Sequence, residues 1–429
     1  MKKVSIISLG CPKNLVDSER ALGSISHKYS ITFNPDDAHI VLINTCAFLE
    51  DSRKEAEEVI NEFVEKKKKG KVEKILVMGC YPSLDVKHLQ EKFPLVDGFV
   101  GTNNLKDVLN ALEYGGVYVD KKPEYADLPR LQVTLPHYSY LKIADGCSHR
   151  CAFCLIPKIK GDTHSFDIEF LVTEASSLSK NGVKELIIIA QDTTQYGVDI
   201  YGEVKLIELL KELEKIENLK WIRLLYTYPI PYMRKVIDYI KNSSKVVPYI
   251  DMPIQHASSK MLKTMHRAYD KKQLEEIVSK IKESGLAFRT SVIVGFPTET
   301  NDDFKELVEF VEKYEIDHIG IFKYSNEPGT DSYKMEQVPE EIKNERFEKL
   351  NKLKDELATK RSKSFLGKTV EFIVDYYDVR SRLSVGRTIY DAPDIDNIVL
   401  VKRKLSEGEI YRGKVLEVSE YEWLVEVIK

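Results

Sequence analysis

Three cysteines lie within eight residues in the middle of the chain, in the stretch CSHRCAFC. Cys147, Cys151 and Cys154 follow one another at spacings of four and three residues. Three thiols at this density indicate a metal site, because cysteine thiolates are the usual protein ligands of structural zinc and of iron–sulfur clusters. The motif itself contains no fourth cysteine, although both kinds of site normally use four protein ligands.

Two metals fit these three thiols. A zinc site would need His149 as its fourth ligand, but this residue lies only two positions after Cys147, and the sequence has no second Cys-x-x-Cys pair. We therefore interpret His149 as a loop or outer-sphere residue. A [4Fe–4S] cluster held by three thiolates leaves one iron open to a substrate or cofactor. We favour the cluster and keep zinc as the alternative.

The other three cysteines each follow an apolar run of strand length. Cys11 ends LGC, Cys46 ends INTC and Cys80 ends MGC, after the runs KVSIISLG, AHIVLINT and EKILVMG. These runs predict buried strands of a parallel sheet. One such cysteine is usually a small buried hydrophobe, but three at the same topological position predict a shared site in the crevice beyond the strand ends.

Composition sets broad limits on the function. The chain has 429 residues, enough for two or three domains, and its 64 basic and 68 acidic side chains give a net charge of −4. A nucleic-acid binder normally shows a basic excess. Apolar runs such as LIIIA are too short to cross a bilayer. The start MKKVSIISLGC is similar to a lipoprotein signal, but Ser5 and Ser8 interrupt its short apolar part. We expect a cytoplasmic protein without disulfides.

The expected fold class is α/β in three parts. Residues 1–120 predict an α/β domain with a parallel sheet, and residues 121–137, with three prolines, predict a linker. Residues 138–338 contain six strand candidates separated by amphipathic stretches: YLKIA, ELIIIAQ, WIRLLY, VPYIDM, FRTSVIVG and DHIGIFKY. Six β/α units predict a partial (β/α)6 barrel, whose functional loops follow the carboxyl ends of the strands.

The end of the chain predicts two further elements. Residues 339–364 read as a long charged connecting helix that stops before Gly367. Residues 365–429 contain short β-rich pieces with glycine turns, which predict a small antiparallel β-barrel. This segment has 10 basic and 12 acidic side chains, a net charge of −2.

The cysteine loop resembles a known family. The pattern C-x-x-x-C-x-x-C, with Phe153 before the last cysteine and a six-unit barrel around it, is similar to the radical S-adenosylmethionine (SAM) superfamily. The resemblance implies that SAM binds the open iron and is cleaved to methionine and a 5′-deoxyadenosyl radical. It also implies that Phe153, Gln191, Gln255, Ile293 and Gly295 contact SAM. For the last four of these residues, ordinary strand packing or hydrogen bonding within a loop is an equally good explanation.

Over its whole length the chain resembles the methylthiotransferases within that superfamily. The resemblance implies that Cys11, Cys46 and Cys80 hold a second [4Fe–4S] cluster, which carries the sulfur to be inserted into an unactivated C–H bond. It further implies a sulfur donor, a reduced flavodoxin or ferredoxin-type electron donor, and no membrane. The terminal β-barrel resembles a TRAM domain. Phe166 departs from the family pattern, which commonly has arginine there.

The branches of the methylthiotransferase family differ in substrate, so similarity to one branch implies its substrate. The stretches SLGCPKNLVDSE, AQDTTQYG, DMPIQHAS and YSNEPGT are similar to the branch that modifies the β-carbon of an aspartate of small-subunit ribosomal protein S-twelve. In the tRNA branches, Gln or Lys tends to replace Pro12, and Asn replaces Asp192. A net charge of −2 suits a basic ribosomal protein better than phosphate, unless VKRK (401–404) forms a local basic face. The alternatives are a tRNA adenosine methylthiotransferase and a zinc-dependent RNA-binding protein.

Overall fold

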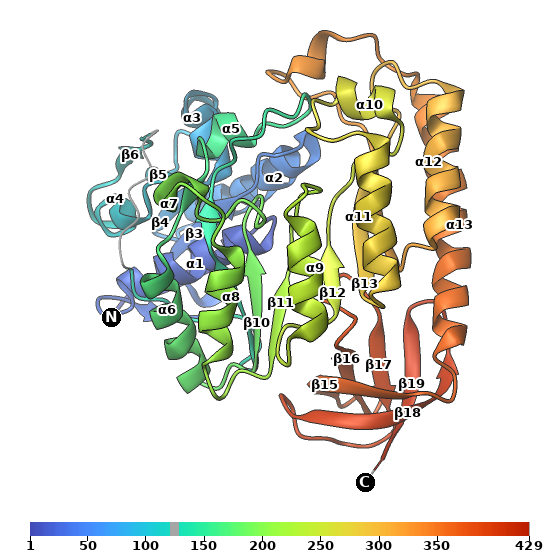
Figure 1. The fold of residues 1–429 in the computed structure, drawn as a ribbon. Coiled ribbons are helices and arrows are strands. Elements are labelled where there is room, and N and C mark those ends of the chain that lie inside the picture. The colour runs from blue at the N-terminus through green and yellow to red at the C-terminus, as the bar shows by residue number, and fades with distance from the viewer. Residues whose placement is uncertain (121–127, 429) are drawn as a thin grey trace. The chain divides into compact units, whose positions relative to one another are not determined.

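The computed structural model describes residues 1–120 and 128–428 and divides the chain into two compact units (Figure 1). The first unit is made of three segments: Met1–Val133, Ala144–Ser165 and Ser325–Tyr333. The second unit contains Thr134–Ile143, Phe166–Tyr324 and Lys334–Lys429. Residues 121–127 of the expected linker lie outside the described residues, and the expected domain boundaries remain a prediction. No helix in the described ranges is both long enough and apolar enough to span a membrane.

The first unit is built on a six-stranded parallel sheet with the order β2-β1-β3-β4-β5-β6. Its strands are β1 (Lys3–Ser8), β2 (Ser30–Ile31), β3 (Ile40–Thr45), β4 (Lys74–Gly79), β5 (Gly98–Gly101) and β6 (Gly116–Tyr118). The three expected strands correspond to β1, β3 and β4. The strand order reverses between β1 and β3, and in open α/β sheets this switch point is where ligands bind.

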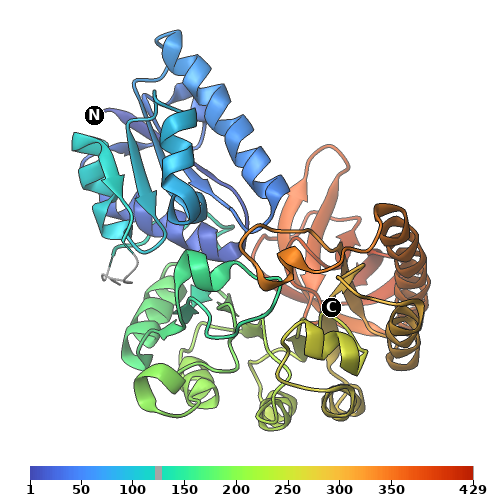
Figure 2. The same cartoon turned by 90° about the horizontal axis from the view of Figure 1, so that it is seen from above.

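Helices cover both faces of this sheet (Figure 2). Side chains along a strand alternate between faces, so Val41 and Ile43 pack in one core, whereas Ile40 and Leu42 pack in the other. The main helices are α1 (Pro12–Ile25), α2 (Glu50–Lys68), α3 (Cys80–Lys92) and α4 (Val108–Tyr114), with short 3-10 turns η1 (Pro35–Asp37) and η2 (Leu105–Asp107). The core on one face includes residues of α2 and α3, and that on the other includes residues of α1 and α4.

The middle and late segments of the first unit contain short elements. These are β8 (Ala144–Asp145), α5 (Ile156–Lys160), β9 (His164–Ser165) and the start of η3 (Asp331–Lys334). β8 and β9 form an antiparallel pair on either side of the CSHRCAFC loop. The loop is therefore closed at its base.

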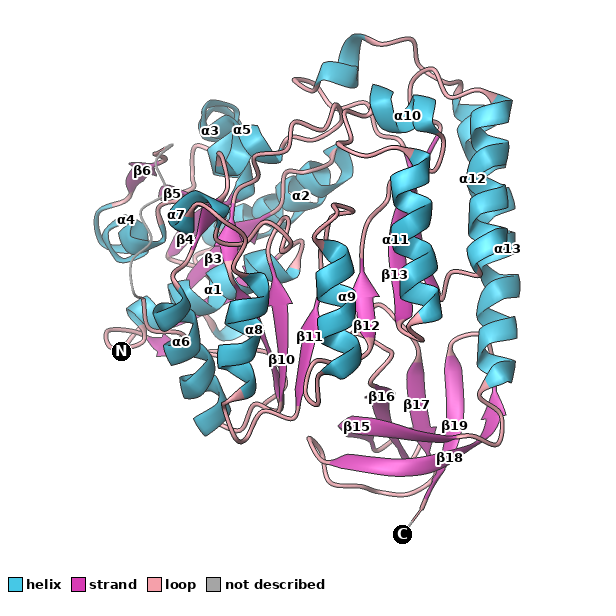
Figure 3. Cartoon of the chain, in the orientation of Figure 1, coloured by secondary structure: helices cyan, strands magenta, loops and turns pink. Residues whose placement is uncertain are grey.

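The second unit contains the six expected strands, all parallel (Figure 3). They form two three-stranded sheets, β11-β10-β7 and β12-β13-β14, linked by a bridge between Ile222 and Val246. The strands are β7 (Tyr138–Lys142), β10 (Glu185–Ile189), β11 (Trp221–Leu224), β12 (Tyr249–Asp251), β13 (Ala287–Val294) and β14 (His318–Lys323). The intervening helices are α6 (Ile168–Lys180), α7 (Val198–Tyr201), α8 (Leu206–Glu214), α9 (Met233–Asn242), α10 (Ser259–Thr264), α11 (Lys271–Glu283) and α12 (Asn301–Tyr314).

The second unit ends in a long helix, α13 (Glu340–Ser364), and a closed five-stranded barrel. A small barrel was expected here, but it is not wholly antiparallel, because its third and fifth strands pair in parallel. The barrel order is β15-β16-β17-β19-β18. Its strands are β15 (Thr369–Asp378), β16 (Leu383–Thr388), β17 (Ile398–Val401), β18 (Ile410–Val418) and β19 (Glu422–Val427). Phe372, Val415 and Trp423 lie in its buried core.

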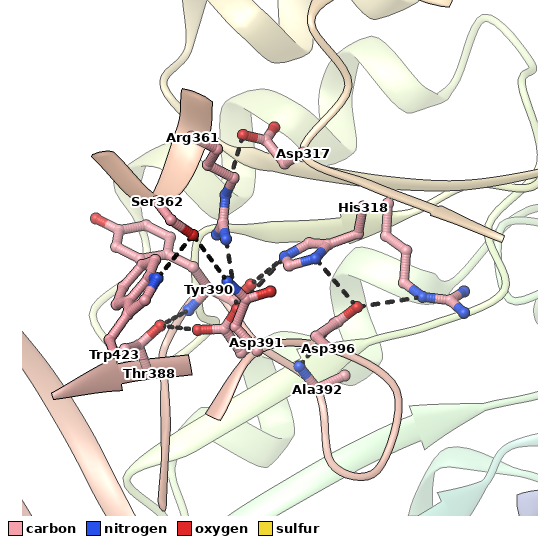
Figure 4. A network of polar contacts seen from close by, with 12 residues as sticks. Asp317, His318, Arg361, Ser362, Thr388, Tyr390, Asp391, Ala392, Asp396 and Trp423 are labelled. Atoms are coloured by element: carbon pink, nitrogen blue, oxygen red, sulfur yellow. Dashed lines mark hydrogen bonds and ion pairs between the residues drawn. The ribbon is translucent and has the colours of Figure 1, made fainter. Parts of the chain in front are cut away.

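A buried polar network joins the small barrel to the parallel strands inside the second unit (Figure 4). His318, the first residue of β14, lies 3.4 Å from Asp391 and 3.3 Å from Asp396. Arg361 of α13 lies 3.7 Å from Asp391, and Trp423 donates to Ser362 at 2.9 Å. Because His318 begins its strand, this network lies at the amino end of β14 and leaves the opposite end for function.

Candidate functional site

Cys11, Cys46 and Cys80 lie at the carboxyl ends of three neighbouring strands. Cys11 is the N-cap of α1 just beyond β1, Cys46 follows β3, and Cys80 is the first residue of α3 immediately after β4. Because β1, β3 and β4 are adjacent in the sheet, the three side chains meet at one edge. Cys11 and Cys46 therefore stand at the switch point of the sheet.

The Asn14 side chain lies at the centre of this group. Its oxygen is 3.9 Å from the sulfur of Cys11 and 3.7 Å from that of Cys80. Its Nδ2 donates to the backbone oxygens of Leu9 and Thr45, both at 3.1 Å. One buried amide thus holds the loops after β1 and β3 and touches two of the three thiols. The sequence alone did not single out Asn14.

Gly10 brings the third thiol into the group. A β-carbon on Gly10 would lie 2.8 Å from the Cys46 β-carbon and 3.3 Å from its sulfur. The φ angle of Gly10 is +92°, a conformation that favours glycine. The residue before Cys11 is therefore packed directly against Cys46.

The electrostatics of this group suit a positively charged metal centre. Burial is the main reason that the pKa of the Cys80 thiol is raised to about 12, and Cys46 and Cys11 contribute to this rise because neighbouring thiolates repel each other. Burial likewise raises the pKa of Cys46, with Cys11 adding to the effect. Metal binding supplies the positive charge that lets such thiols ionise. The donor set therefore fits an iron–sulfur cluster.

A buried charged cluster lies next to Cys80 and was not expected from the sequence. Lys160 of α5 is 3.0 Å from Asp145 and 3.6 Å from Asp17, and it donates to the Thr102 hydroxyl at 2.9 Å. Burial alone would lower the pKa of Lys160, but the two carboxylates raise it well above its usual value. Its positive charge opposes the rise in the pKa of Cys80.

The second cysteine trio lies on the loop between β8 and α5, in the same compact unit. Cys147 N–H donates to the Gly161 oxygen at 3.0 Å, which closes the loop, and Cys154 N–H donates to the Cys151 oxygen at 3.1 Å. All three residues are half-buried. The backbone N–H of Ile156 donates to the Cys154 sulfur at 3.4 Å. The loop presents a donor set that fits a cluster.

Residues 1–120 and 128–428 contain no group of three His, Cys, Asp or Glu side chains placed to hold a single metal ion. A [4Fe–4S] cluster takes one thiolate per iron, so its ligands lie farther apart than those of one ion. His149 is half-buried on the loop, and its backbone oxygen accepts from Arg150 at 3.3 Å.

The remaining predicted site residues fall in both units. Phe153 lies half-buried on the cysteine loop of the first unit. In the second unit, Gln191 follows β10, Gln255 follows β12, and Ile293 and Gly295 lie at the end of β13. The Gln255 backbone oxygen accepts from Ile293 N–H at 2.8 Å, and Gln255 has a φ angle of +67°. The structure thus brings these two residues together at the carboxyl end of the strands, and their roles remain a prediction.

Phe166 occupies an apolar position. It is buried, and its ring centre lies 5.6 Å from that of Phe170. Its backbone oxygen accepts from the Tyr196 hydroxyl at 2.7 Å. The aromatic side chain at this departure from the family pattern is accommodated by neighbouring aromatic residues.

Comparison with known families identifies three regions. The radical SAM superfamily model matches residues 141–311, the Uncharacterized protein family UPF0004 model matches residues 3–101, and the TRAM domain model matches residues 366–428. A radical SAM methyltransferase, TsrM from Kitasatospora setae, is similar in structure, with a TM-score of 0.57, 16% identity and 77% of each chain covered. The cobalamin-dependent SAM radical enzyme OxsB has a TM-score of 0.51 over 78% of this chain and 55% of its own. Fold and matches thus define the radical SAM class.

Relatives with a similar sequence show to which family within the radical SAM class the chain belongs. A protein of Aquifex aeolicus is 42% identical over 98% of this chain and 96% of its own length, and one of Elusimicrobium minutum is 39% identical over 98% of both. Both carry the name ribosomal protein uS12 methylthiotransferase RimO. The chain belongs to this RimO family of radical SAM methylthiotransferases, and the zinc-dependent RNA-binding alternative is therefore set aside.

Proposed function

We propose that this chain adds a methylthio group to the β-carbon of an aspartate in small-subunit ribosomal protein uS12. The observation that carries the proposal is the convergence of Cys11, Cys46 and Cys80 around Asn14, in the same compact unit as the loop of Cys147, Cys151 and Cys154. Two separate cysteine trios are what a reaction with two different tasks, SAM cleavage and sulfur delivery, needs.

Each trio has its own role. Cys147, Cys151 and Cys154 would hold the [4Fe–4S] cluster that binds and cleaves SAM, and Cys11, Cys46 and Cys80 would hold the cluster that supplies the sulfur. When bound, the clusters and SAM supply the electron, the radical chemistry and the sulfur that amino acid side chains lack. The SAM contacts come from Phe153, Gln191, Gln255, Ile293 and Gly295.

The charge of the chain supports a protein substrate. The net charge of the whole chain is −4, and residues 365–429 carry two more acidic than basic side chains. An acidic surface is complementary to a basic ribosomal protein and repels phosphate. The enzyme works in the cytoplasm, with a flavodoxin or ferredoxin-type electron donor and a separate sulfur donor.

One observation favours a tRNA adenosine as the alternative substrate. Lys402, Arg403 and Lys404 follow β17 directly and are all exposed, and the Ser384 hydroxyl donates to the Arg403 backbone oxygen at 2.8 Å. Clustered basic side chains of this kind bind phosphate. The small barrel therefore has a local basic face despite its net charge.

A substrate assay distinguishes the two. Reconstituted protein is incubated without oxygen with SAM, a reductant and a peptide from the aspartate loop of uS12, and in parallel with tRNA. We expect the mass of a methylthio group on the peptide and none on tRNA. A peptide with Asn in place of the aspartate is the control. Modification of tRNA and not of the peptide would contradict the proposal and support the alternative.

A further inference from the structure

The loop of residues 325–333, SNEPGTDSY, follows β14 but belongs to the first compact unit, with the cysteine loop and the N-terminal sheet. Within it, the Glu327 backbone oxygen accepts from Thr330 N–H at 3.2 Å and from the Thr330 hydroxyl at 2.7 Å. Pro328 and Gly329 occupy the two central positions, and Gly329 has a φ angle of +90°. This combination is typical of a type II turn, which reverses the chain directly after Glu327.

Glu327 binds the beginning of α2. Its carboxylate accepts from the Glu50 N–H at 2.8 Å and pairs with Arg53 at 2.7 Å, while the Ser325 hydroxyl donates to it at 2.7 Å. The Leu49 N-cap of α2 makes no side-chain capping bond, so Glu327 supplies the acceptor that the first turn of a helix needs. Arg53 also donates to the Ala47 oxygen at 3.1 Å, directly after Cys46.

The other end of the loop binds the backbone of the CSHRCAFC loop at Ala152. The backbone N–H and the hydroxyl of Ser332 both donate to the Ala152 oxygen at 2.9 Å, and both residues are fully buried. Ala152 is the residue after Cys151. Lys158, on α5, donates to the Gly329 oxygen. The loop therefore contacts the first turn of α2, which reaches Ala47 through Arg53, at one end and Ala152, the residue after Cys151, at the other.

The Glu327 carboxylate is only 2% exposed. A charge in such a place is strongly unfavourable unless it is paired and hydrogen-bonded. Three donors from two elements satisfy it, which makes this contact rigid. A rigid contact is what two reacting centres need, because a misplacement of about 1 Å can cost about a hundredfold in rate.

We propose that the 325–333 loop positions the two cysteine trios relative to each other, with Glu327 holding the Cys46 side and Ser332 holding the Cys151 side. This inference rests on the proposed function, in which the two trios carry successive steps. Glu327 is a positioning residue, since it reaches the cysteines only through α2 and Ala47. Its loss misaligns sulfur delivery while leaving SAM cleavage intact.

The first test uses the metal-free protein and needs no activity. In Glu327→Ala we expect hydrogen exchange at the Glu50 amide and alkylation of Cys46 to be at least about tenfold faster, since both depend on local opening. Alkylation of Cys147 serves as the internal reference. Glu55→Ala is the matched control, because Glu55 is exposed on the same helix. Unchanged exchange at Glu50 would overturn the inference.

The second test uses the reconstituted enzyme and the uS12 peptide. We expect 5′-deoxyadenosine formation within about twofold of wild type and a rise of at least about tenfold in the ratio of 5′-deoxyadenosine to methylthiolated product. If 5′-deoxyadenosine and the methylthiolated product fell together in the variant, Glu327 would have a merely structural role and the inference would be overturned. Arg53→Met with Glu327→Gln removes both charges and provides a second variant if Glu327→Ala does not fold. A wild type that makes no methylthio product contradicts the proposed function instead.

Discussion

At Gly79, the residue before Cys80, the space that a β-carbon would need is already filled. Such an atom would lie 2.2 Å from the Asn44 side-chain oxygen and 2.8 Å from the Thr45 backbone oxygen, and the φ angle is +97°. Asn44 in turn donates to the Asn14 backbone oxygen at 2.7 Å. The smallest residue is therefore required where the chain turns from β4 into α3 and aims Cys80 at its partners.

Gly79→Ala is expected to destabilise the protein by about 3 kcal/mol, because it adds backbone strain and a steric clash. Gly70→Ala is the matched control, since Gly70 also has a positive φ angle of +71° but nothing within 4 Å of its β-carbon position. The control is expected to cost about 1 kcal/mol. Urea unfolding of the metal-free variants measures both, and equal losses would contradict the clash.

The two cysteine trios are the residue-level feature that the sequence revealed most directly. Each of Cys11, Cys46 and Cys80 follows an apolar run, and the rule that parallel strand ends share an edge was enough to predict that they meet. The Asn14 amide was not predictable, because its partners at Leu9 and Thr45 are backbone groups that leave no trace in the sequence.

Alanine variants of single cysteines are expected to distinguish the roles of the two cysteine trios. Cys151→Ala is expected to abolish 5′-deoxyadenosine formation, because SAM loses its cluster. Cys46→Ala is expected to keep at least part of it and to stop formation of the methylthio product. Chromatography of nucleosides and mass spectrometry of the uS12 peptide measure the two outcomes. The same loss for both folded variants would contradict the division of roles.

Among the elements, α5 shows most clearly what the sequence concealed. This short helix follows the cysteine loop directly, and its last residue, Lys160, pairs with Asp145 of β8 and Asp17 of α1. Glu327 and Arg53 are likewise paired across 274 positions. Charged residues make up 31% of the chain, so no spacing rule distinguishes buried partners from solvated ones. Strands β2, β5 and β6 were not predicted from the sequence either.

Lys160→Met is expected to destabilise the protein by about 3–5 kcal/mol, because it leaves Asp145 and Asp17 buried without their cation. Lys87→Met, an exposed position on α3, is expected to change stability by less than about 0.5 kcal/mol. Chemical unfolding gives both values. A loss below about 1 kcal/mol for Lys160→Met would show that the carboxylates find other partners.

At the scale of the whole molecule, the network of Figure 4 makes stability depend on pH. Burial lowers the pKa of His318; Asp396 and Asp391 oppose this shift, and Arg361 reinforces it. The folded-state pKa thus lies below the unfolded value of about 6.5, so the unfolded chain binds the proton first. The stabilisation is complete above about pH 6.5 and is lost as the pH falls below it.

Between pH 7 and pH 5.5 the free energy of unfolding is expected to fall, with a contribution from His318 of at most about 1.4 kcal/mol per pH unit. His318→Gln should show a smaller slope over this range. The neighbouring Asp396 has a lowered pKa and titrates at more acidic pH. Urea unfolding at several pH values measures the slopes, and identical slopes would exclude His318 as the source.

The first compact unit is assembled from chain segments that the ribosome makes at widely separated times. Its sheet can emerge early, but Ser325–Tyr333 leaves the exit tunnel only after the strands β7 to β14 have been synthesised. Domains that are contiguous in sequence can fold as they emerge, whereas this unit cannot be completed on the nascent chain before residue 333 of 429. The complete surroundings of the two thiol sets therefore exist only after most of the polypeptide has been synthesised.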